Sequence, residues 1–137
     1  MRKIFAIANQ KGGVGKTTTT VNLAAGLARV GQRVLVVDLD PQGNATMGSG
    51  IDKRKLELSI YDVLLESASI AEAKQPSAKG GYDVLGANRE LAGAEVELVV
   101  LERRNERLRD ALAAAQIDYD FVLIDCPPSL SLLTLNG

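Results

Sequence analysis

The residues of this chain that are best suited to chemistry lie in one glycine-rich segment near its start. The segment consists of Lys11, Gly12, Gly13, Val14, Gly15, Lys16, Thr17 and Thr18. It follows an apolar run at residues 4–8 and precedes a helical pattern that begins near Thr17. A glycine-rich turn between a strand and a helix exposes consecutive backbone N–H groups, and the positive end of the helix dipole strengthens their attraction for anions. The segment therefore predicts a phosphate-binding loop.

Three side chains of this loop have chemistry of their own. Lys16 is spaced to reach the β- and γ-phosphates of a nucleotide, and the Thr17 hydroxyl is placed to complete the ligand shell of a Mg²⁺ ion. The usual pattern, G-x-x-x-x-G-K-[ST], has a glycine where this chain has Gln10, and a second lysine, Lys11, follows it. Lys11 is either a further phosphate contact or a solvated loop lysine.

Carboxylates follow two later apolar runs. Asp38 and Asp40 come after the run at residues 34–37, and Asp125 ends the run at residues 121–124. A carboxylate beside a phosphate loop either belongs to the Mg²⁺ shell or orients the attacking water. We assign such a role to Asp40, whereas Asp38 either acts directly or anchors the neighbouring loop. Asp125 has the position of a Walker B aspartate and is expected to hold a Mg²⁺-bound water.

The apolar runs predict the fold that positions these side chains. The runs at residues 4–8, 34–37 and 121–124 are uniformly apolar, which is typical of parallel strands covered on both faces. A helix at residues 17–30, ended by Gly31 as its C′ residue, would connect the first two strands by a right-handed crossover. We therefore expect an α/β fold whose strands deliver their polar residues to one sheet edge, where ligands bind.

The middle of the chain carries weaker signals. They predict a loop at residues 43–50, a short helix through Leu65 that Ser59 caps with Asp62 in the capping-box position, a strand at residues 83–86, and a helical stretch at residues 90–115 broken near Asn105. The charged residues 102–109 are interpreted as a solvated helix face.

Composition excludes several classes of protein. A chain of 137 residues has room for one domain, and its net charge of −1 gives no overall attraction to nucleic acid. It contains no histidine, which excludes Ser-His-Asp triads and histidine metal sites. The single cysteine, Cys126, excludes an internal disulfide and is interpreted as a packing residue. No run is long enough for a signal or membrane segment, so we expect a cytoplasmic protein.

Three segments together resemble a known family. They are the loop at residues 11–18, the sequence DLDPQGN at residues 38–44 and the sequence LIDCPPS at residues 123–129. They are similar to the deviant Walker-A ATPases, and most of all to the ParA/Soj-type chromosome- and plasmid-partitioning proteins. The sequence LAGAEVE at residues 91–97 also resembles that branch, so the likeness runs from end to end.

This resemblance implies a fold, an activity and a set of partners. The fold is a three-layer, parallel-sheet P-loop NTPase, of which residues 1–137 form the N-terminal part of a single domain, because members of the family are about twice this long. The activity is a slow, partner-stimulated hydrolysis of ATP with Mg²⁺. An ATP-dependent homodimer would bind DNA without sequence preference, through the absent C-terminal half, and a ParB-type protein would trigger hydrolysis. Such a protein is nucleoid-associated.

The resemblance also assigns residues. Lys11 would reach across the dimer to the nucleotide of the other subunit, and Asp40 would serve hydrolysis. The alternatives are a MinD-like division-site regulator, a nucleotide-dependent electron-transfer protein of the nitrogenase-iron-protein type, and a non-enzymatic ATP-binding module. One cysteine does not fit an iron–sulfur role, and the PQGN sequence at residues 41–44 resembles the partition branch more than the MinD branch.

Overall fold

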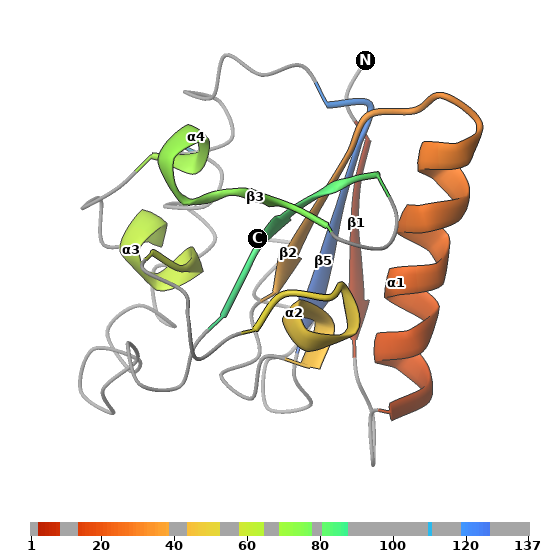
Figure 1. The fold of residues 1–137 in the computed structure, drawn as a ribbon, viewed down its shortest axis with the longest axis horizontal. Helices are drawn as coiled ribbons and strands as arrows, with labels where there is room; N and C mark the ends of the chain where they lie inside the picture. The colour runs from red at the N-terminus through yellow and green to blue at the C-terminus, as the bar shows by residue number, and fades with distance from the viewer. Residues whose placement is uncertain are drawn as a thin grey trace.

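The computed structural model describes residues 3–8, 14–38, 44–52, 58–64, 69–77, 81–87, 110 and 119–126. Its elements, in chain order, are β1 (Lys3–Ala8), α1 (Val14–Arg29), β2 (Val34–Asp38), α2 (Asn44–Gly48), α3 (Ile60–Leu64), α4 (Ile70–Ala73), β3 (Gln75–Pro76), β4 (Asp83–Leu85) and β5 (Phe121–Cys126). Figure 1 shows α1 running alongside the strands, with α3 and α4 towards the opposite side of the sheet.

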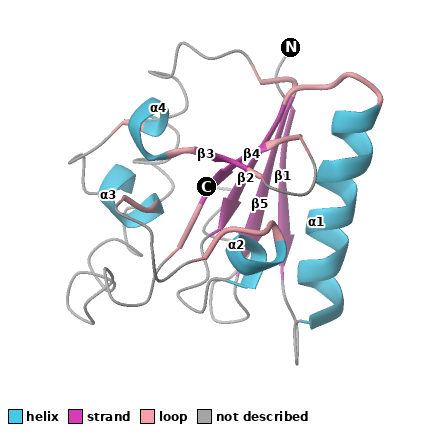
Figure 2. Ribbon diagram, viewed as in Figure 1, coloured by secondary structure: helices cyan, strands magenta, loops and turns pink. Residues whose placement is uncertain are grey.

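The strands form one five-stranded sheet in the order β1-β5-β2-β4-β3. β5 pairs in parallel with β1 on one side and β2 on the other, and β4 pairs in parallel with β2. Only the short β3 is antiparallel, and it pairs with β4. The predicted α/β fold with parallel strands at residues 4–8, 34–37 and 121–124 is confirmed, and residues 83–85 of the strand predicted at residues 83–86 form β4 (Figure 2).

Both faces of the central strands are buried, as their uniformly apolar sequences predict. The face towards α1 and α2 carries a core made of Ala24, Val34, Val36, Ala45, Ile51, Tyr82, Val84 and Leu123. Side chains of the opposite face, such as Leu35, Val37 and Val122, are also fully buried. A sheet covered on both faces needs no alternation of polar residues, which is why β2 and β5 are so apolar.

The turn after α1 confirms the predicted role of Gly31. Gly31 has a φ of +88°, its N–H donates to the carbonyl of Ala28, and the N–H of Gln32 donates to the carbonyl of Leu27. This pair of bonds is a Schellman motif, which satisfies the last carbonyls of a helix and favours glycine at C′. The helix thus ends where the sequence predicts, and β2 begins three residues after the glycine.

The prediction of a loop at residues 43–50 is wrong, because Asn44–Gly48 forms the helix α2. α2 ends in a second Schellman motif, in which Gly50 has a φ of +84° and the N–H of Ile51 donates to the carbonyl of Thr46. The segment has no apolar periodicity to reveal a helix. It is held instead by its C-terminal cap and by tertiary hydrogen bonds of Thr46, described below.

The other short elements divide into one confirmed prediction and two omissions. The capping-box position of Asp62 is confirmed for α3, because the backbone N–H of Ser59 donates to the Asp62 carboxylate at 2.8 Å, and the Ser59 hydroxyl lies 3.4 Å from the same oxygen. α4 and β3 were not predicted, although Ser69 and Glu72 form a complete capping box at the start of α4. The helix predicted at residues 90–115 lies outside the described residues, apart from Asp110, which is helical.

Candidate nucleotide and metal site

The carboxyl ends of three neighbouring strands bring the candidate site residues into one row. In the sheet register, Ile7 of β1 is the partner of Asp125 of β5, and Asp125 is the partner of Asp38 of β2. Register partners of parallel strands have side chains on the same face, and alternation places Asp38 with Val36 and Asp125 with Leu123. Both aspartates therefore lie on the face that α1 and α2 cover.

Asp125 is held from α1. Its side chain is fully buried, and Oδ1 accepts a hydrogen bond from the Thr20 hydroxyl at 3.3 Å. Thr20 is itself fully buried and lies one helical turn after Lys16. A buried carboxylate is costly unless it is hydrogen-bonded, so this contact and the others that Asp125 makes fix the position of its charge.

Asp38 is held from α2. Its Oδ2 accepts two hydrogen bonds from one residue, the backbone N–H of Thr46 at 2.9 Å and the Thr46 hydroxyl at 2.8 Å. The same hydroxyl accepts a bond from the backbone N–H of Ala87, just after β4, at 3.0 Å. Of the two roles left open for Asp38 by the sequence, this geometry supports the anchoring one, because Asp38 fixes α2 to the edge of the sheet.

The glycine-rich segment runs directly into α1, which begins at Val14, three residues earlier than the predicted start at Thr17. Glycine is tolerated there because the first N–H groups of a helix have no partner within the helix. The early start assigns the backbone N–H groups of Val14, Gly15 and Lys16 to the first turn, where the helix dipole favours an anion. The segment thus connects a strand to a helix, as predicted, but the helix begins within the segment at Val14 and not near Thr17.

Not every predicted site residue can be located. Lys11, Gly12, Gly13 and Asp40 lie outside the described residues. Val14, Gly15, Lys16, Thr17 and Thr18 are described through their helical backbone. The structure brings the start of α1 and Asp125 to the same edge of the sheet, as the sequence predicts (Figure 1).

The residues at this edge fit a magnesium ion that is shared with phosphates. Within the described part of the chain, no group of three or more acidic or cysteine side chains could hold a metal by itself. Mg²⁺ in phosphate sites uses one or two protein oxygens, the phosphates and water, so it needs no such group. Asp125 and the hydroxyl of Thr17 are oxygen ligands of the kind that Mg²⁺ prefers.

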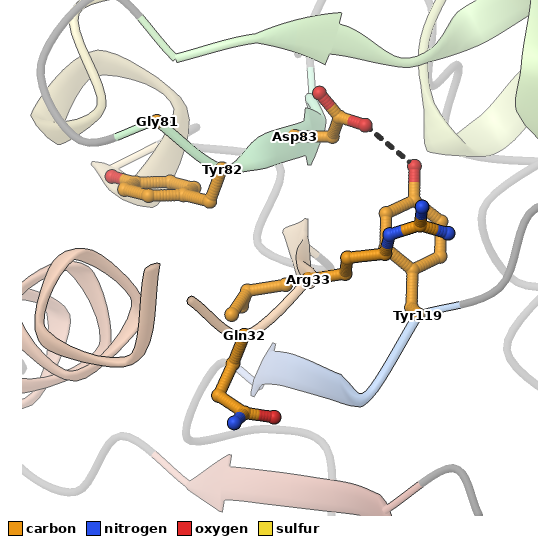
Figure 3. A pocket seen from close by; sticks show the side chains of 7 residues that line it. Gln32, Arg33, Gly81, Tyr82, Asp83 and Tyr119 are labelled. Atoms are coloured by element: carbon orange, nitrogen blue, oxygen red, sulfur yellow. Dashed lines mark hydrogen bonds between the residues drawn. The ribbon is translucent and has the colours of Figure 1, made fainter. Parts of the chain in front are cut away.

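A hollow of about 250 Å³ lies at the amino ends of the strands and is lined by Gln32, Arg33, Val34, Gly81, Tyr82, Asp83 and Tyr119 (Figure 3). There the Tyr119 hydroxyl donates to Asp83 at 2.7 Å, and Lys74 lies 3.4 Å from the same carboxylate oxygen. Burial, with a further effect of the bond to Asp83, raises the pKa of Tyr119 above its ordinary value. These groups join β3, β4 and the start of β5, and they stand apart from the phosphate loop.

Comparison with known proteins agrees with this geometry. A family model described as an AAA domain matches residues 2–137. The sporulation initiation inhibitor protein Soj of Bacillus subtilis is 54% identical over 137 residues, which are 100% of this chain and 54% of Soj. The chromosome partitioning protein ParA of Caulobacter vibrioides is 50% identical, over 98% of this chain and 51% of ParA. The chain therefore spans about half the length of the curated relatives it matches.

A solved structure shows the same fold with a ligand. The cobyrinic acid a,c-diamide synthase of Mycobacterium smegmatis, with a bound ATP analogue and magnesium, superposes with a TM-score of 0.85. It is 47% identical, over 100% of this chain and 54% of that protein. The parallel sheet with its glycine loop is thus a P-loop NTPase fold. The chain belongs to the AAA-domain family whose family model matches residues 2–137, and within it to the ParA/Soj branch of the deviant Walker-A ATPases.

The roles of two residues of the site are not predicted by the sequence. Thr20 and Thr46 contact the two strand-end aspartates from separate helices. Thr20 lies 105 residues from its partner Asp125 in the sequence, so no local pattern predicts the contact.

Among the helices that the structure describes, none is long and apolar enough to span a membrane.

Proposed function

We propose that the protein is an ATP-hydrolysing partition switch. It binds ATP with Mg²⁺, dimerises in that state, binds DNA without sequence preference and is triggered to hydrolyse ATP by a ParB-type partner. Residues 1–137 belong to a single ATPase domain in this proposal, and the protein acts at the nucleoid. The names of the relatives Soj and ParA support the partition role.

One observation carries the ATPase part of the proposal. The first turn of α1, which is the positive end of the helix dipole, and the buried Asp125 lie at the same sheet edge and are connected through Thr20. A helix N-terminus attracts phosphates, and an adjacent carboxylate suits the metal that accompanies them. The bound ATP analogue and magnesium in the related synthase structure support the same assignment.

Each residue has a defined task in the proposed reaction. Backbone N–H groups of residues 11–18 cradle the phosphates, and Lys16 balances the charge of the β- and γ-phosphates. Thr17 and Asp125 would hold the Mg²⁺ ion, whose charge would lower the repulsion between the phosphate oxygens. Asp40 orients the attacking water, a task for which the chain has no histidine. Lys11 approaches the nucleotide of the partner subunit.

The activity is tested by phosphate release from the full-length protein, with and without DNA and the ParB-type protein. We expect slow release that the two additions stimulate together, and loss of release in Lys16→Ala. Lys74→Ala is a matched control, because it removes the same charge beside Asp83, at the other edge of the sheet. Tight ATP binding without stimulated release would support the non-enzymatic ATP-binding module instead.

Three further measurements test the roles of Asp40 and Lys11 and the remaining alternative function. Asp40→Ala is expected to bind ATP and to accumulate as the ATP-bound dimer, because only water activation is lost. Mixing Lys11→Ala with Lys16→Ala subunits tests whether Lys11 acts across the dimer. Nucleotide-dependent binding to lipid vesicles, rather than to DNA, would favour a MinD-like regulator over a partition switch.

A further inference from the structure

The two buried aspartates at the carboxyl edge of the sheet accept hydrogen bonds from different helices. Asp38 accepts two short bonds from Thr46, at 2.8 and 2.9 Å, which commit one of its oxygens to α2. Asp125 accepts a longer bond, at 3.3 Å, from Thr20 of α1. A hydroxyl–carboxylate bond of ordinary strength is shorter, at about 2.5–3.0 Å. The bond from Thr20 is therefore weaker than either bond from Thr46.

The position of Thr20 on α1 gives this orientation a consequence. α1 carries in its first turn the backbone groups that we assign to phosphate binding, and Thr20 follows Lys16 by one turn on the same side of the helix. The Thr20 hydroxyl consequently connects the helix that holds the phosphates to the strand that carries the metal carboxylate. Both partners are fully buried, so solvent does not replace the bond when it is lost.

The direction of the hydrogen bond is fixed by its chemistry. An ionised carboxylate only accepts, so the Thr20 hydroxyl donates to Oδ1 of Asp125. Donation to one oxygen restricts rotation of the carboxylate about its own bond. A carboxylate that is already oriented loses less conformational freedom when it binds a hydrated cation than one that rotates.

We propose that Thr20 is the positioning residue of the metal site, which orients Asp125 for the Mg²⁺ ion that accompanies the nucleotide. The inference rests on the proposed function, because it assumes that Asp125 acts on that ion. It adds a residue outside the phosphate loop, and it separates the task of Asp125 from that of Asp38. In this proposal Thr20 acts through Asp125 and not on the nucleotide or the reacting atoms.

The test measures how much Mg²⁺ strengthens nucleotide binding. The affinity of the full-length protein for a non-hydrolysable ATP analogue is determined by titration calorimetry, once with Mg²⁺ and once with EDTA. The ratio of the two affinities is compared between wild type, Thr20→Val and Thr20→Ser. Valine has the shape of threonine without the hydroxyl, and serine restores the hydroxyl without the methyl group.

We expect Thr20→Val to reduce the Mg²⁺-dependent ratio about five- to tenfold, which is less than a short hydrogen bond to a charged group is worth, because this bond is long at 3.3 Å. Its affinity in EDTA should match that of wild type, and Thr20→Ser should restore most of the ratio. A merely structural residue would instead weaken binding equally in both conditions. An unchanged ratio in Thr20→Val, or one that Thr20→Ser fails to restore, would overturn the inference.

The same experiment distinguishes failure of the inference from failure of the proposed function. If wild type binds the ATP analogue no better with Mg²⁺ than with EDTA, the proposed metal site itself is wrong. If wild type shows the Mg²⁺ effect and Thr20→Val retains it, only the role of Thr20 is wrong. Unfolding of each variant in urea verifies that the compared proteins are folded.

Discussion

Replacement of Thr46 by valine should remove the anchor between α2 and the sheet. The Thr46 hydroxyl donates to Asp38 at 2.8 Å and accepts from the N–H of Ala87 at 3.0 Å, and all three residues are fully buried. Valine keeps the shape of the side chain but makes neither bond. The backbone N–H of residue 46 still donates to Asp38, so one of the two bonds to that carboxylate remains.

The expected loss of stability follows from these contacts. A hydrogen bond to a charged group contributes about 1.5–3 kcal/mol, and a buried N–H left without its acceptor costs about 1–3 kcal/mol. Because the two effects share one hydroxyl and are not additive, we expect Thr46→Val to lower the free energy of unfolding by about 3 kcal/mol. Thr46→Ser keeps the hydroxyl and loses one methyl group, which costs about 1 kcal/mol.

The assay is urea unfolding of the full-length protein without nucleotide, followed by circular dichroism. Thr46→Val should unfold at a clearly lower urea concentration than Thr46→Ser, with a similar dependence of the free energy on urea. If the two variants are equally stable within about 0.5 kcal/mol, the Asp38–Thr46–Ala87 contacts do not anchor α2, and our reading of Asp38 is wrong.

Two further predictions concern stability. Gly26→Ala should stabilise α1 by about 0.5–1 kcal/mol, because nothing lies within 4 Å of an added Cβ. Gly31→Ala should destabilise the protein by about 1 kcal/mol or more, because Gly31 has a φ of +88°. Equal stabilities of the two variants in urea unfolding would contradict both predictions. Because the pKa of Tyr119 is raised in the folded protein, the neutral phenol stabilises the fold. This contribution to the free energy of unfolding is complete below the ordinary pKa of about 10 and is lost as the pH rises above that value. Between pH 8 and pH 10.5 wild type should therefore lose more stability than Tyr119→Phe, and parallel losses would show that the bond to Asp83 does not favour the neutral phenol.

The strands could be predicted from the sequence because their physical cause is local. Residues 34–37 of β2 and 121–124 of β5 are uniformly apolar, because both faces of these strands are buried, and such a run is recognisable from the sequence alone. Gly31 was likewise predictable, since a positive φ at a helix end favours glycine. The one local signal of α4 is the capping box of Ser69 and Glu72, which marks the start of a helix.

Other elements depend on contacts that no local pattern records. α2 is five residues long and is held by a side chain of β2, and β3 consists of two residues that pair with β4. The phosphate loop and Asp125 could be recognised as candidates because their residue types and spacing are specific. Thr20 could not, because a threonine in the middle of a helix has no distinguishing spacing, and its partner belongs to a distant strand.

The central claim, that the start of α1 binds the phosphates of ATP, is tested most directly by titration calorimetry of the full-length protein with Mg²⁺ and a non-hydrolysable ATP analogue. Lys16→Ala should weaken binding by a few kcal/mol, because a charged contact to the β- and γ-phosphates is lost. Lys74→Ala should bind as wild type does, because Lys74 contacts Asp83 at the other edge of the sheet. Equal affinities of wild type and Lys16→Ala would contradict the account.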